Sequence, residues 1–554
     1  MAVNATYPGE YIREIPSGVR TIIGVATSVA AFVGRARVGP VDVPVTINDY
    51  SGFERIFGGL WQHGAMSYAV RDFFRNGGGQ AVVIRVYRPE TGGGGAPRAL
   101  AVLDVNGLAL VAASPGAWGN SLRVRVDKNV KQTVLDLYGL ERGQVFNLAI
   151  RDLDRGIDEY HRNLTSADSP RRVDRVLQNQ SNLVRTRPGV ELQVPGEHST
   201  PAPGRDPWSN AHSTHVIAEN KASDGAVLTS AEILGSEAAS SGMFALDKVD
   251  VFNLLCIPPY LADGNIEYQA VIPAAARYCE RRRAVLLIDS PSEWADKDRA
   301  KQGISAIGTA SKNASVFFPR LLQPNPLRSN RIERFASCGA VAGVIARTDG
   351  QRGVWKAPSG TDAALVGAAG LDVSLTDADI GELDPLGINC LRPLPTAGFA
   401  VWGARTLQRG DRLGSEWKYL PVRRLILFIE DSLYRGTRWA VAEPNDETLW
   451  SQLRFHVASF MHDLFRRGVF HGKTPNQAYF VKCDRETTTR YHIDRGVVNV
   501  LVGFAPLNPA GFVLIKIQQS TASSPLESRA PGPTTSLQVQ SNTESNHREV
   551  RSVP

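Results

Sequence analysis

A stripe of apolar residues at every third or fourth position between Glu447 and Arg467 is the clearest pattern in the sequence. The stripe consists of Leu449, Trp450, Leu453, Val457, Phe460, Met461 and Leu464. This period places the apolar side chains on one face of an amphipathic helix. Asn445 or Asp446 can accept hydrogen bonds from the free amides of the first turn, and Gly468 provides a stop. The pattern predicts a helix over residues 447–467.

Runs of branched and aromatic residues on both sides of this helix predict strands. The apolar run 421–430 is too short to span a membrane, and we expect it to form a buried strand. Three more strands are predicted at residues 478–483, 497–504 and 511–519. In the last of these, Phe512, Leu514 and Lys516 alternate with Val513, Ile515 and Ile517. A helix on such strands forms an α+β layer with its own core, which we assign to residues 387–519.

Alternating strands and helices between residues 249 and 347 are typical of a partly parallel sheet with crossover helices. The predicted strands are 249–257, 284–288 and 315–318, and the predicted helices are 267–282, 298–312 and 335–346. An earlier stretch, residues 20–88, holds the apolar run 29–34, a helix at 67–75 and a strand at 81–87. We expect both stretches to form one discontinuous α/β domain, residues 19–98 with 243–386.

Short alternating runs separated by turn residues, such as residues 122–126, predict a mostly β domain over residues 99–242. A glycine-rich break at 91–97 precedes it. Within it, residues 193–213 are dense in Pro, Gly, Ser and His and predict an exposed loop. Insertions are well tolerated at such positions, so we interpret this domain as a peripheral insertion. The fold class is therefore a multidomain α+β and α/β protein.

The two ends of the chain differ from the domains between them. Residues 1–18 are polar and extended in character, with a short alternation over Glu10, Tyr11, Ile12, Arg13, Glu14 and Ile15. A strand of this size is not stable alone, so it must pair either within its own domain or with a neighbouring molecule. Residues 520–554 lack aromatic residues and are rich in Ser, Thr, Asn and Pro, which predicts a disordered or surface-draped tail. We expect nothing in that tail to cover the outer edge of the strand at 511–519.

Composition sets outer bounds on the class of protein. The 554 residues are 43% hydrophobic, which suits two to four domains with substantial cores. No apolar run approaches the roughly 20 residues of a membrane helix, and residues 1–8 lack the features of a secretion signal. We therefore expect no membrane insertion and a protein that starts in the cytoplasm. The formal charge of +7 favours a solvated surface over nucleic-acid binding, because no Lys/Arg stripe interleaved with aromatic residues stands out.

Three motifs that could bind phosphate or nucleotides or act in a hydrolase are better explained as structural features of loops and turns. Asn76 to Gly79 follow a helix and precede a strand, the reverse of a phosphate-binding loop, and predict a helix stop. Residues 468–474 have one residue too few between their glycines for a nucleotide-binding loop. Asp289 follows a strand, but no Gly-x-Ser-x-Gly elbow accompanies it, so a turn cap is favoured.

Cysteine and histidine positions do not indicate a metal site or a disulfide framework. The five cysteines, which are odd in number and scattered, are Cys256, Cys279, Cys338, Cys390 and Cys483. We expect them to be reduced core residues. Cys483, Asp484, His492 and Asp494 lie close in sequence but lack the paired short spacing of zinc ligands. The sequence therefore predicts no catalytic, cofactor-binding or metal-binding residues.

Several short motifs occur in one order along most of the chain. Before the C-terminal third they are Tyr7-Pro8-Gly9-Glu10-Tyr11-Ile12, Ser114-Pro115-Gly116-Ala117-Trp118-Gly119-Asn120 and Arg347-Thr348-Asp349. Within it they are Val422-Arg423-Arg424-Leu425, Glu443-Pro444-Asn445-Asp446, Lys482-Cys483-Asp484 and Gly503-Phe504-Ala505-Pro506-Leu507. Together they resemble the contractile tail sheath proteins. The shared order makes the resemblance more specific than any single motif.

The resemblance implies a structural, non-enzymatic subunit that polymerises helically around an inner tube and contracts to drive the tube through a target envelope. The implied partners are copies of itself, the inner tube protein, and baseplate and terminator proteins of a phage tail or an extracellular injection particle. It also implies that terminal arms, here Glu10 to Ile15 and Phe512 to Ile517, add strands to the sheets of neighbouring subunits. Candidate tube contacts are Arg454, Arg466, Arg467 and Lys473, with solvated helix-end charges as the alternative.

Two other classes of function stay open at this point. A hydrolase or nucleotide-binding enzyme built on the sheet at 249–347 would require a concave pocket with convergent polar groups. A carbohydrate-binding surface protein would use the domain at 99–242.

Overall fold

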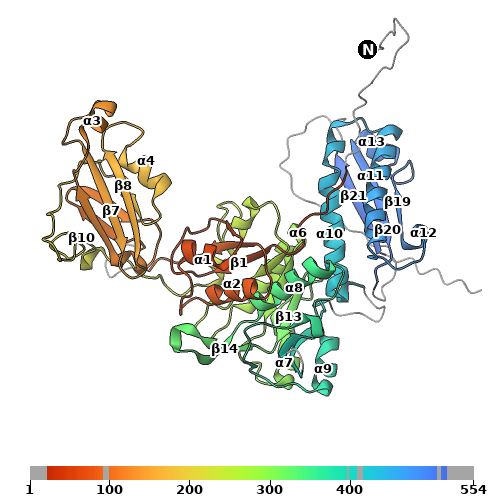
Figure 1. Ribbon diagram of the computed structural model, residues 1–554. Helices are drawn as coiled ribbons and strands as arrows, with labels where there is room; N and C mark the ends of the chain where they lie inside the picture. The colour runs from red at the N-terminus through yellow and green to blue at the C-terminus, as the bar shows by residue number, and fades with distance from the viewer. Residues whose placement is uncertain (1–20, 91–98, 396–397, 409–415, 508–512, 521–554) are drawn as a thin grey trace, which may run out of the picture. The chain divides into compact units, whose positions relative to one another are not determined.

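The computed structural model describes residues 21–90, 99–395, 398–408, 416–507 and 513–520 (Figure 1). The chain forms two compact units, Ala26–Arg424 and Met1–Val25 with Leu425–Pro554. The boundary between them falls inside helix α10 (Leu420–Gly436). Each unit has its own sheets and is described by itself.

An eight-stranded sheet organises the first unit, in the order β18-β17-β13-β12-β11-β1-β3-β2. Its strands are β1 (Ala30–Gly34), β2 (Val45–Ile47), β3 (Ala81–Arg85), β11 (Leu254–Cys256), β12 (Val285–Asp289), β13 (Ala314–Phe318), β17 (Ile388–Leu394) and β18 (Gly398–Val401). The six inner strands run parallel, and β2 and β18 pair antiparallel at the two edges. The partly parallel sheet expected from the alternation of strands and helices is confirmed, and it joins both α/β stretches of the sequence.

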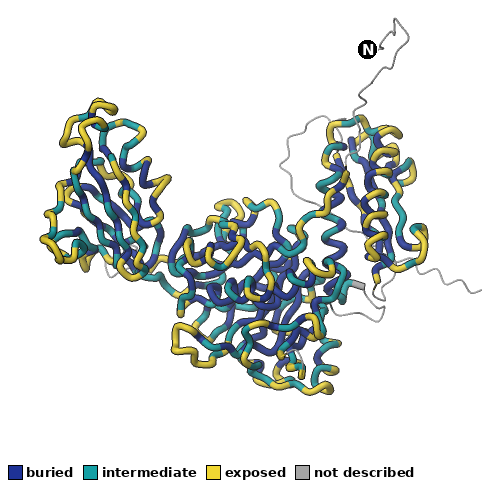
Figure 2. The backbone as a smooth tube through the Cα atoms, in the orientation of Figure 1, coloured by how far each residue is buried: buried dark blue, intermediate teal, exposed yellow. Residues whose placement is uncertain are grey.

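Helices surround this sheet, and its strands are buried among them (Figure 2). They are α1 (Tyr50–Phe57), α2 (Ala65–Arg75), α6 (Tyr268–Arg282), α7 (Lys297–Gly303), α8 (Cys338–Arg352) and α9 (Asp377–Leu383). The helix predicted at 298–312 is shorter, because α7 ends at Gly303 and a 3-10 turn follows. Two glycines let α8 approach α2 closely: a Cβ at Gly339 would lie 2.0 Å from the Ala69 carbonyl oxygen, and one at Gly343 2.4 Å from that of Phe73.

A small antiparallel sheet adjoins the eight-stranded one. It has the order β15-β14-β16, and its strands are β14 (Leu321–Asn325), β15 (Arg331–Phe335) and β16 (Gly370–Leu371). The loop Asn76 to Gly79 ends α2, and Gly77 has a φ of 105°, which suits glycine. The predicted helix stop is confirmed.

Residues 99–242 are mostly β, as predicted. One sheet has the order β10-β6-β7-β8 and the other β4-β5-β9. The strands are β4 (Val102–Val105), β5 (Leu108–Ala112), β6 (Leu122–Asp127), β7 (Val145–Asp152), β8 (Ile157–Thr165), β9 (Val184–Thr186) and β10 (Thr214–His215). The helices are α3 (Gln132–Tyr138), α4 (Val173–Gln180) and α5 (Ser230–Leu234). Strand β6 alternates buried and half-buried residues, which explains the alternation in the sequence.

The motif Ser114 to Asn120 lies where this β region meets the eight-stranded sheet. Arg85, buried at the end of β3, donates to the carbonyl oxygens of Gly39 (2.6 Å) and Pro115 (2.6 Å). The Ser114 hydroxyl accepts from the Gly39 amide at 3.1 Å. Burial lowers the pKa of Arg85 to about 10, while these carbonyl oxygens satisfy its donors. The motif therefore ties the start of the insertion to the core sheet.

The second unit contains two long helices and a three-stranded sheet. They are α10, α11 (Glu447–Arg466), β19 (Tyr479–Lys482), β20 (Val497–Phe504) and β21 (Val513–Ser520). The short helices α12 (Pro475–Ala478) and α13 (Arg490–Asp494) lie between the strands. The predicted helix at 447–467 is confirmed, with the Asp446 carboxylate accepting from the Leu449 amide at 2.9 Å.

The strand predicted at 421–430 is wrong, because these residues belong to α10. Residues 421–427 are all buried, so the helix is enclosed on every side in its first two turns. A helix buried all round has no polar stripe, and its sequence then looks like the continuous apolar run of a central strand.

The boundary placed at residue 387 lies too early. Strands β17 and β18 extend the eight-stranded sheet, since Val316 of β13 pairs with Ile388 and Leu391 pairs with Val401. The domain predicted at 387–519 therefore loses its first part to the α/β unit, and the C-terminal unit begins within α10.

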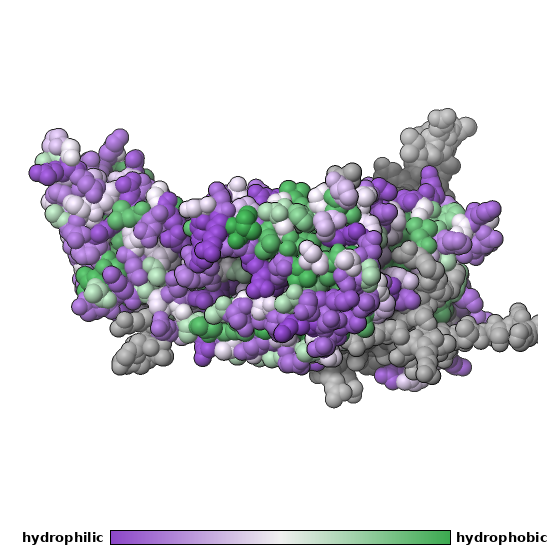
Figure 3. Space-filling view, turned by 90° about the horizontal axis from the view of Figure 1, so that it is seen from below, coloured by the Kyte–Doolittle hydropathy of each residue, from purple (hydrophilic) through white to green (hydrophobic). Residues whose placement is uncertain are grey.

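Hydrophilic residues cover most of the face seen in Figure 3, with hydrophobic residues in small groups among them. Among the described residues, no helix has the length and apolar character needed to cross a membrane. All five cysteines are free and buried, which confirms the prediction of reduced core residues.

A buried ion pair fixes the first turn of α10 to α8. Arg424 and Asp349 have side chains that are each 3% exposed, and the guanidinium meets both carboxylate oxygens, at 2.8 and 2.5 Å. Arg424 also donates to the Thr27 carbonyl oxygen at 2.9 Å. Two separate sequence motifs thus meet in one bidentate contact, which has stricter geometry than a single charge pair.

Replacing one member of this pair should destabilise the protein strongly. In Asp349→Asn the buried guanidinium of Arg424 loses its counter-charge, and we expect the free energy of unfolding to fall by about 3–5 kcal/mol. The matched control is Asp362→Asn, which removes an ion pair with Arg352 whose side chains are 64% and 55% exposed. The control should lose no more than about 1 kcal/mol. Urea unfolding measures both, and equal losses would contradict the assignment.

Candidate functional site

The sheet of the C-terminal unit ends in an open edge strand (Figure 1). β20 lies in the centre and pairs antiparallel with β19 on one side and β21 on the other. The β20–β21 register runs without interruption from Val497 opposite Ser520 to Phe504 opposite Val513. No further strand of the described chain pairs with the outer side of β21. Its outward backbone groups are therefore available for another strand.

β21 differs from the other edge strands of the described chain in its lack of protection. The only longer one, β8, carries the carboxylates of Asp158 and Glu159 and the basic side chains of His161 and Arg162, and its pairing with β7 is interrupted by a register shift. β15 has the charged sequence Arg-Ile-Glu-Arg-Phe. β21 has eight residues, one charge and no bulge. Charges and bulges normally prevent edge-to-edge pairing, so β21 is the edge best suited to accept or donate a strand.

The buried face of this sheet holds β21 in place. Val498, Val500, Val502 and Phe504 of β20 are fully buried, and Val513, Ile515 and Ile517 of β21 are 2–6% exposed. α11 packs against β19 and β20, and all seven residues of its predicted apolar stripe are buried. The alternation of the sequence therefore places one face of each strand against the helices.

The predicted strand-addition residues fall into two groups. Val513, Ile515 and Ile517 point into the core, Leu514 is half-buried and Lys516 is exposed, all within this chain's own sheet. Phe512 and the segment Glu10 to Ile15 lie outside the described residues. Exchange of either segment between copies of the chain stays a prediction.

Two glutamines at the end of β21 make contacts that sequence reasoning missed. Gln519 is 5% exposed, and its amide nitrogen donates to the Tyr434 carbonyl oxygen and to the Thr437 hydroxyl, both at 2.9 Å. On the other face, the Gln518 amide donates to Asn499 Oδ1 at 2.9 Å. The available signal was an amide at position 519, where the alternation calls for an apolar residue.

The four predicted tube-contact residues are not equivalent. Arg454 donates to the Cys483 carbonyl oxygen and, at 2.9 Å, to Glu447 Oε1, so it is engaged within its own domain. Arg466, Arg467 and Lys473 are exposed in the stretch from the last turn of α11 to the start of α12. This basic stretch, rather than Arg454, is the part of the set that faces solvent.

Residues at the carboxyl ends of the parallel strands were the candidates for an enzyme site. Asp289 is buried, and its Oδ1 accepts from the backbone amides of Ser337 (2.7 Å) and Cys338 (2.8 Å). It therefore caps the start of α8, where free amides need acceptors, and not its own turn. Asp289 therefore has a structural role, as expected, but it caps the helix α8 of a distant segment and not the turn that follows its own strand.

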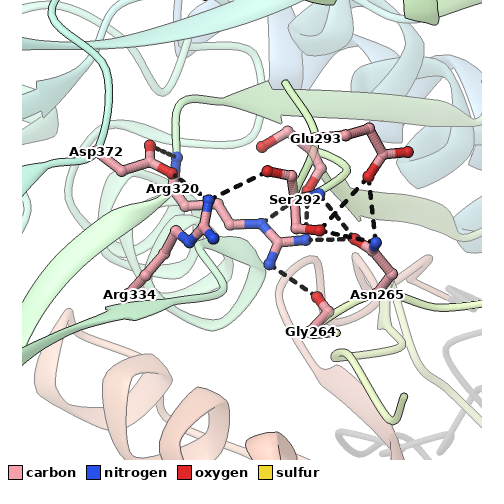
Figure 4. Close-up of polar contacts among 8 residues, drawn as sticks. Gly264, Asn265, Ser292, Glu293, Arg320, Arg334 and Asp372 are labelled. Atoms are coloured by element: carbon pink, nitrogen blue, oxygen red, sulfur yellow. Dashed lines mark hydrogen bonds and ion pairs between the residues drawn. The ribbon is translucent and has the colours of Figure 1, made fainter. Parts of the chain in front are cut away.

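Arg320 joins the loops that follow β11, β12 and β13 (Figure 4). It is 5% exposed and donates to the carbonyl oxygens of Gly264 (2.7 Å) and Ser290 (2.6 and 2.8 Å). It also donates to Asn265 Oδ1 at 3.1 Å, and the Asn265 amide in turn donates to Ser292 Oγ at 2.8 Å. These hydrogen bonds hold the three loops together, a structural use of polar groups.

A cavity of about 630 Å³ lies close to these loops, bordered among others by Glu267, Glu293, Trp294 and Arg299. The Glu267 carboxylate accepts from the Ser230 amide at 2.6 Å, and Glu293 accepts from the Asn265 amide at 3.2 Å. The acidic groups of the lining thus already have partners within the fold. In the described residues that border this cavity, the carboxylates of Glu267 and Glu293 are thus engaged in the fold, which does not favour the hydrolase or nucleotide-binding alternative.

Two of the residues considered as metal ligands, Cys483 and His492, lie in surroundings that do not suit metal binding. Burial raises the pKa of the Cys483 thiol to about 12, which disfavours a thiolate, and the His492 ring contacts the hydroxyl of Thr489 at 2.9 Å. Within the part of the chain that the structure describes, no group of three or more His, Cys, Asp or Glu residues could hold a metal ion.

The C-terminal unit resembles known proteins in sequence. Residues 414–520 match the family model of the phage tail sheath C-terminal domain. A prophage major tail sheath protein of Pseudomonas aeruginosa (strain UCBPP-PA14) is 25% identical over 210 residues. That match spans 38% of this chain and 52% of the relative. The resemblance expected from the motifs is confirmed, and the open sheet edge lies within the residues that match this family model.

Solved structures share the fold over nearly the whole chain. A sheath tail protein from Listeria innocua has a TM-score of 0.61 at 12% identity, covering 90% of this chain and 96% of that one. The helical sheath of the anti-feeding prophage in its contracted state has a TM-score of 0.52 at 22% identity, covering 93% of this chain and 100% of that one. The chain therefore has the multidomain fold of sheath proteins.

The difference between Arg454 and Arg466 can be measured in the isolated chain. Arg454→Met removes the hydrogen bonds to the Cys483 carbonyl and Glu447, and we expect a loss of about 1–2 kcal/mol in the free energy of unfolding. Arg466→Met, the matched control on the same helix, should change it by less than about 0.5 kcal/mol. Urea unfolding of both variants tests this, and a neutral Arg454→Met would restore that residue as a candidate partner contact.

Proposed function

We propose that this chain is the structural subunit of a contractile tail sheath, which polymerises helically around an inner tube and contracts to drive the tube through a target envelope. The observation that carries the proposal is the sheath C-terminal domain at residues 414–520, whose sheet ends in the unprotected strand β21. An exposed regular edge is a liability in a monomer and is stabilised when another strand covers it. Assembly of many copies provides such strands.

The subunits are joined by strand addition. The arm Glu10 to Ile15 of one copy pairs with the open sheet edge of a neighbour. Strand β21 exchanges between copies and pairs with the neighbour's β20 in the same register as within its own chain. Backbone hydrogen bonds give affinity, and alternate side chains give the register. Breaking such a pairing means losing several hydrogen bonds together, so the connection survives while the subunits move.

Contraction requires that contacts with the inner tube break while contacts between subunits persist. Exposed ionic contacts suit the tube side, since each contributes little and is screened by salt. Arg466, Arg467 and Lys473 are the basic residues of the candidate set that face solvent. The subunits rotate nearly as rigid bodies, and the strand-exchanging terminal arms act as hinges. Baseplate and terminator proteins complete the particle, which assembles in the bacterial cytoplasm.

Removing the N-terminal arm should separate folding from assembly. Deletion of residues 1–15 should leave a folded monomer, because the described cores lie outside this segment, but should abolish sheath tubes. Circular dichroism and size-exclusion chromatography measure the first property, and negative-stain electron microscopy the second. Ile12→Pro, which removes one amide donor and restricts the strand, should act in the same direction.

The control for the arm is Asn4→Ala, which leaves the Glu10 to Ile15 alternation intact and should still form tubes. Ordered tubes from the deletion variant would show that the arm is not the connection.

Charge reversal should weaken binding to the inner tube without affecting the sheath itself. The double variant Arg466→Glu and Lys473→Glu should reduce co-sedimentation with inner tubes by at least about tenfold at low salt, with the difference shrinking as ionic strength rises. Glu486→Lys, an exposed reversal of opposite sign elsewhere in the same unit, is the control and should not weaken binding. Unchanged co-sedimentation of the double variant would exclude this stretch as the tube contact.

A further inference from the structure

Apolar packing alone does not determine how far along β20 the strand β21 is placed. Both strands present alternate branched residues to the helices, namely Val498, Val500 and Val502 opposite Gln519, Ile517 and Ile515. A shift by one residue would turn the apolar face outward, which burial forbids. A shift by two residues keeps nearly every apolar residue opposite another. The hydrophobic pattern therefore selects the face of β21 but not its position.

Gln519 removes this ambiguity on the buried face. Its amide donates at 2.9 Å to the Tyr434 carbonyl oxygen, in the last turn of α10, where carbonyl groups have no partner within the helix. The same nitrogen donates at 2.9 Å to the hydroxyl of Thr437, a residue that is 1% exposed. A shift by two residues moves this amide by about 7 Å and can bring Ile517 to the helix end. Both hydrogen bonds are then lost in a buried place.

On the opposite face of the sheet, Gln518 makes a hydrogen bond that depends on the same register. Its amide donates to Oδ1 of Asn499, the residue directly opposite it in β20. Asn499 is itself fixed: its backbone amide donates to the Thr488 hydroxyl at 3.0 Å, and its side-chain amide to the Thr487 carbonyl oxygen at 2.9 Å. Its remaining oxygen is thereby oriented for a donor from β21. Adjacent residues of one strand thus each find a buried polar partner in a single register.

We propose that Gln518 and Gln519 form a register latch, and that this latch makes the sheet select the terminal strand of a copy of this chain over other apolar strands. The selection rests on the proposed function, in which copies exchange strands, whereas the register itself does not. The latch partners lie on α10, β20 and the segment between them, so they are the same whether β21 comes from its own chain or from a second copy. A strand without the two amides loses the hydrogen bonds to the Tyr434 carbonyl oxygen, the Thr437 hydroxyl and Asn499 Oδ1.

Paired cysteines in the full-length chain measure the register directly. Leu501→Cys with Lys516→Cys joins residues that are opposite each other, and Leu501→Cys with Leu514→Cys joins residues that meet only after a two-residue shift. All three positions are half-buried or exposed, and the five native cysteines are buried. On mild oxidation the first pair should form a disulfide and the second should not. The reverse result, or no disulfide in the first pair, would overturn the register.

The latch is then tested by adding Gln519→Met, which keeps the length of the side chain and removes its amide. We expect the yield of the shifted disulfide, relative to the paired one, to rise by about tenfold. Ser520→Ala, the exposed neighbour, is the matched control and should leave the ratio unchanged. An unchanged ratio in Gln519→Met would overturn the latch.

The same gels separate the latch from the proposed function. In assembled material, non-reducing electrophoresis shows whether each disulfide joins one chain or two. Crosslinks between chains support exchange of β21. Crosslinks only within chains would overturn that exchange but leave the latch intact. An unchanged disulfide ratio in Gln519→Met would overturn the latch but leave the exchange intact.

Discussion

Unpaired backbone groups along one strand are the constraint on which this protein's organisation depends. β21 uses one side for eight cross-strand pairs with β20 and leaves its other side without a strand of the described chain. Other edges are short, charged or irregular, and such features discourage pairing. The unprotected edge thus stands in the region that matches the sheath C-terminal domain. In the proposed function a strand of a neighbouring copy covers this edge, which gives a physical reason for polymerisation.

Buried polar contacts give the fold its specific geometry. The apolar cores decide which faces of helices and strands come together, but many close arrangements satisfy an apolar surface. Arg424 with Asp349, Arg320 with three loops, and Gln519 with the end of α10 each have one good arrangement. Each leaves buried groups unpaired in any other arrangement, which is costly. In the proposed function each subunit moves as a rigid body while its connections to neighbours persist, and buried contacts of this kind would keep its geometry fixed.

Errors in the sequence-based expectations share a cause. Residues 421–430 belong to a helix whose first two turns, residues 421–427, are buried on all sides, so the polar stripe that identifies a helix is missing there. Strands β17 and β18 follow the α/β segment in sequence, with β17 beside β13 and β18 beside β17, but nothing local distinguishes this from membership of the C-terminal sheet. Arg454 looked like a free helix charge, yet it bonds with Glu447 and with the carbonyl of Cys483. In each case the deciding neighbours are on other elements.

By itself, the sequence determined the helix α11, the strands β20 and β21, the alternation that builds the parallel sheet, and the reduced state of the five cysteines. These features follow from side-chain periods and spacings that repeat within a few residues. Only the tertiary structure decided that α10 is a helix, that β17 and β18 join the larger sheet, and that the amide of Gln519 meets the end of α10. The physical reason is that burial on all sides, strand partnership and hydrogen-bond partners are set by residues far away in the chain.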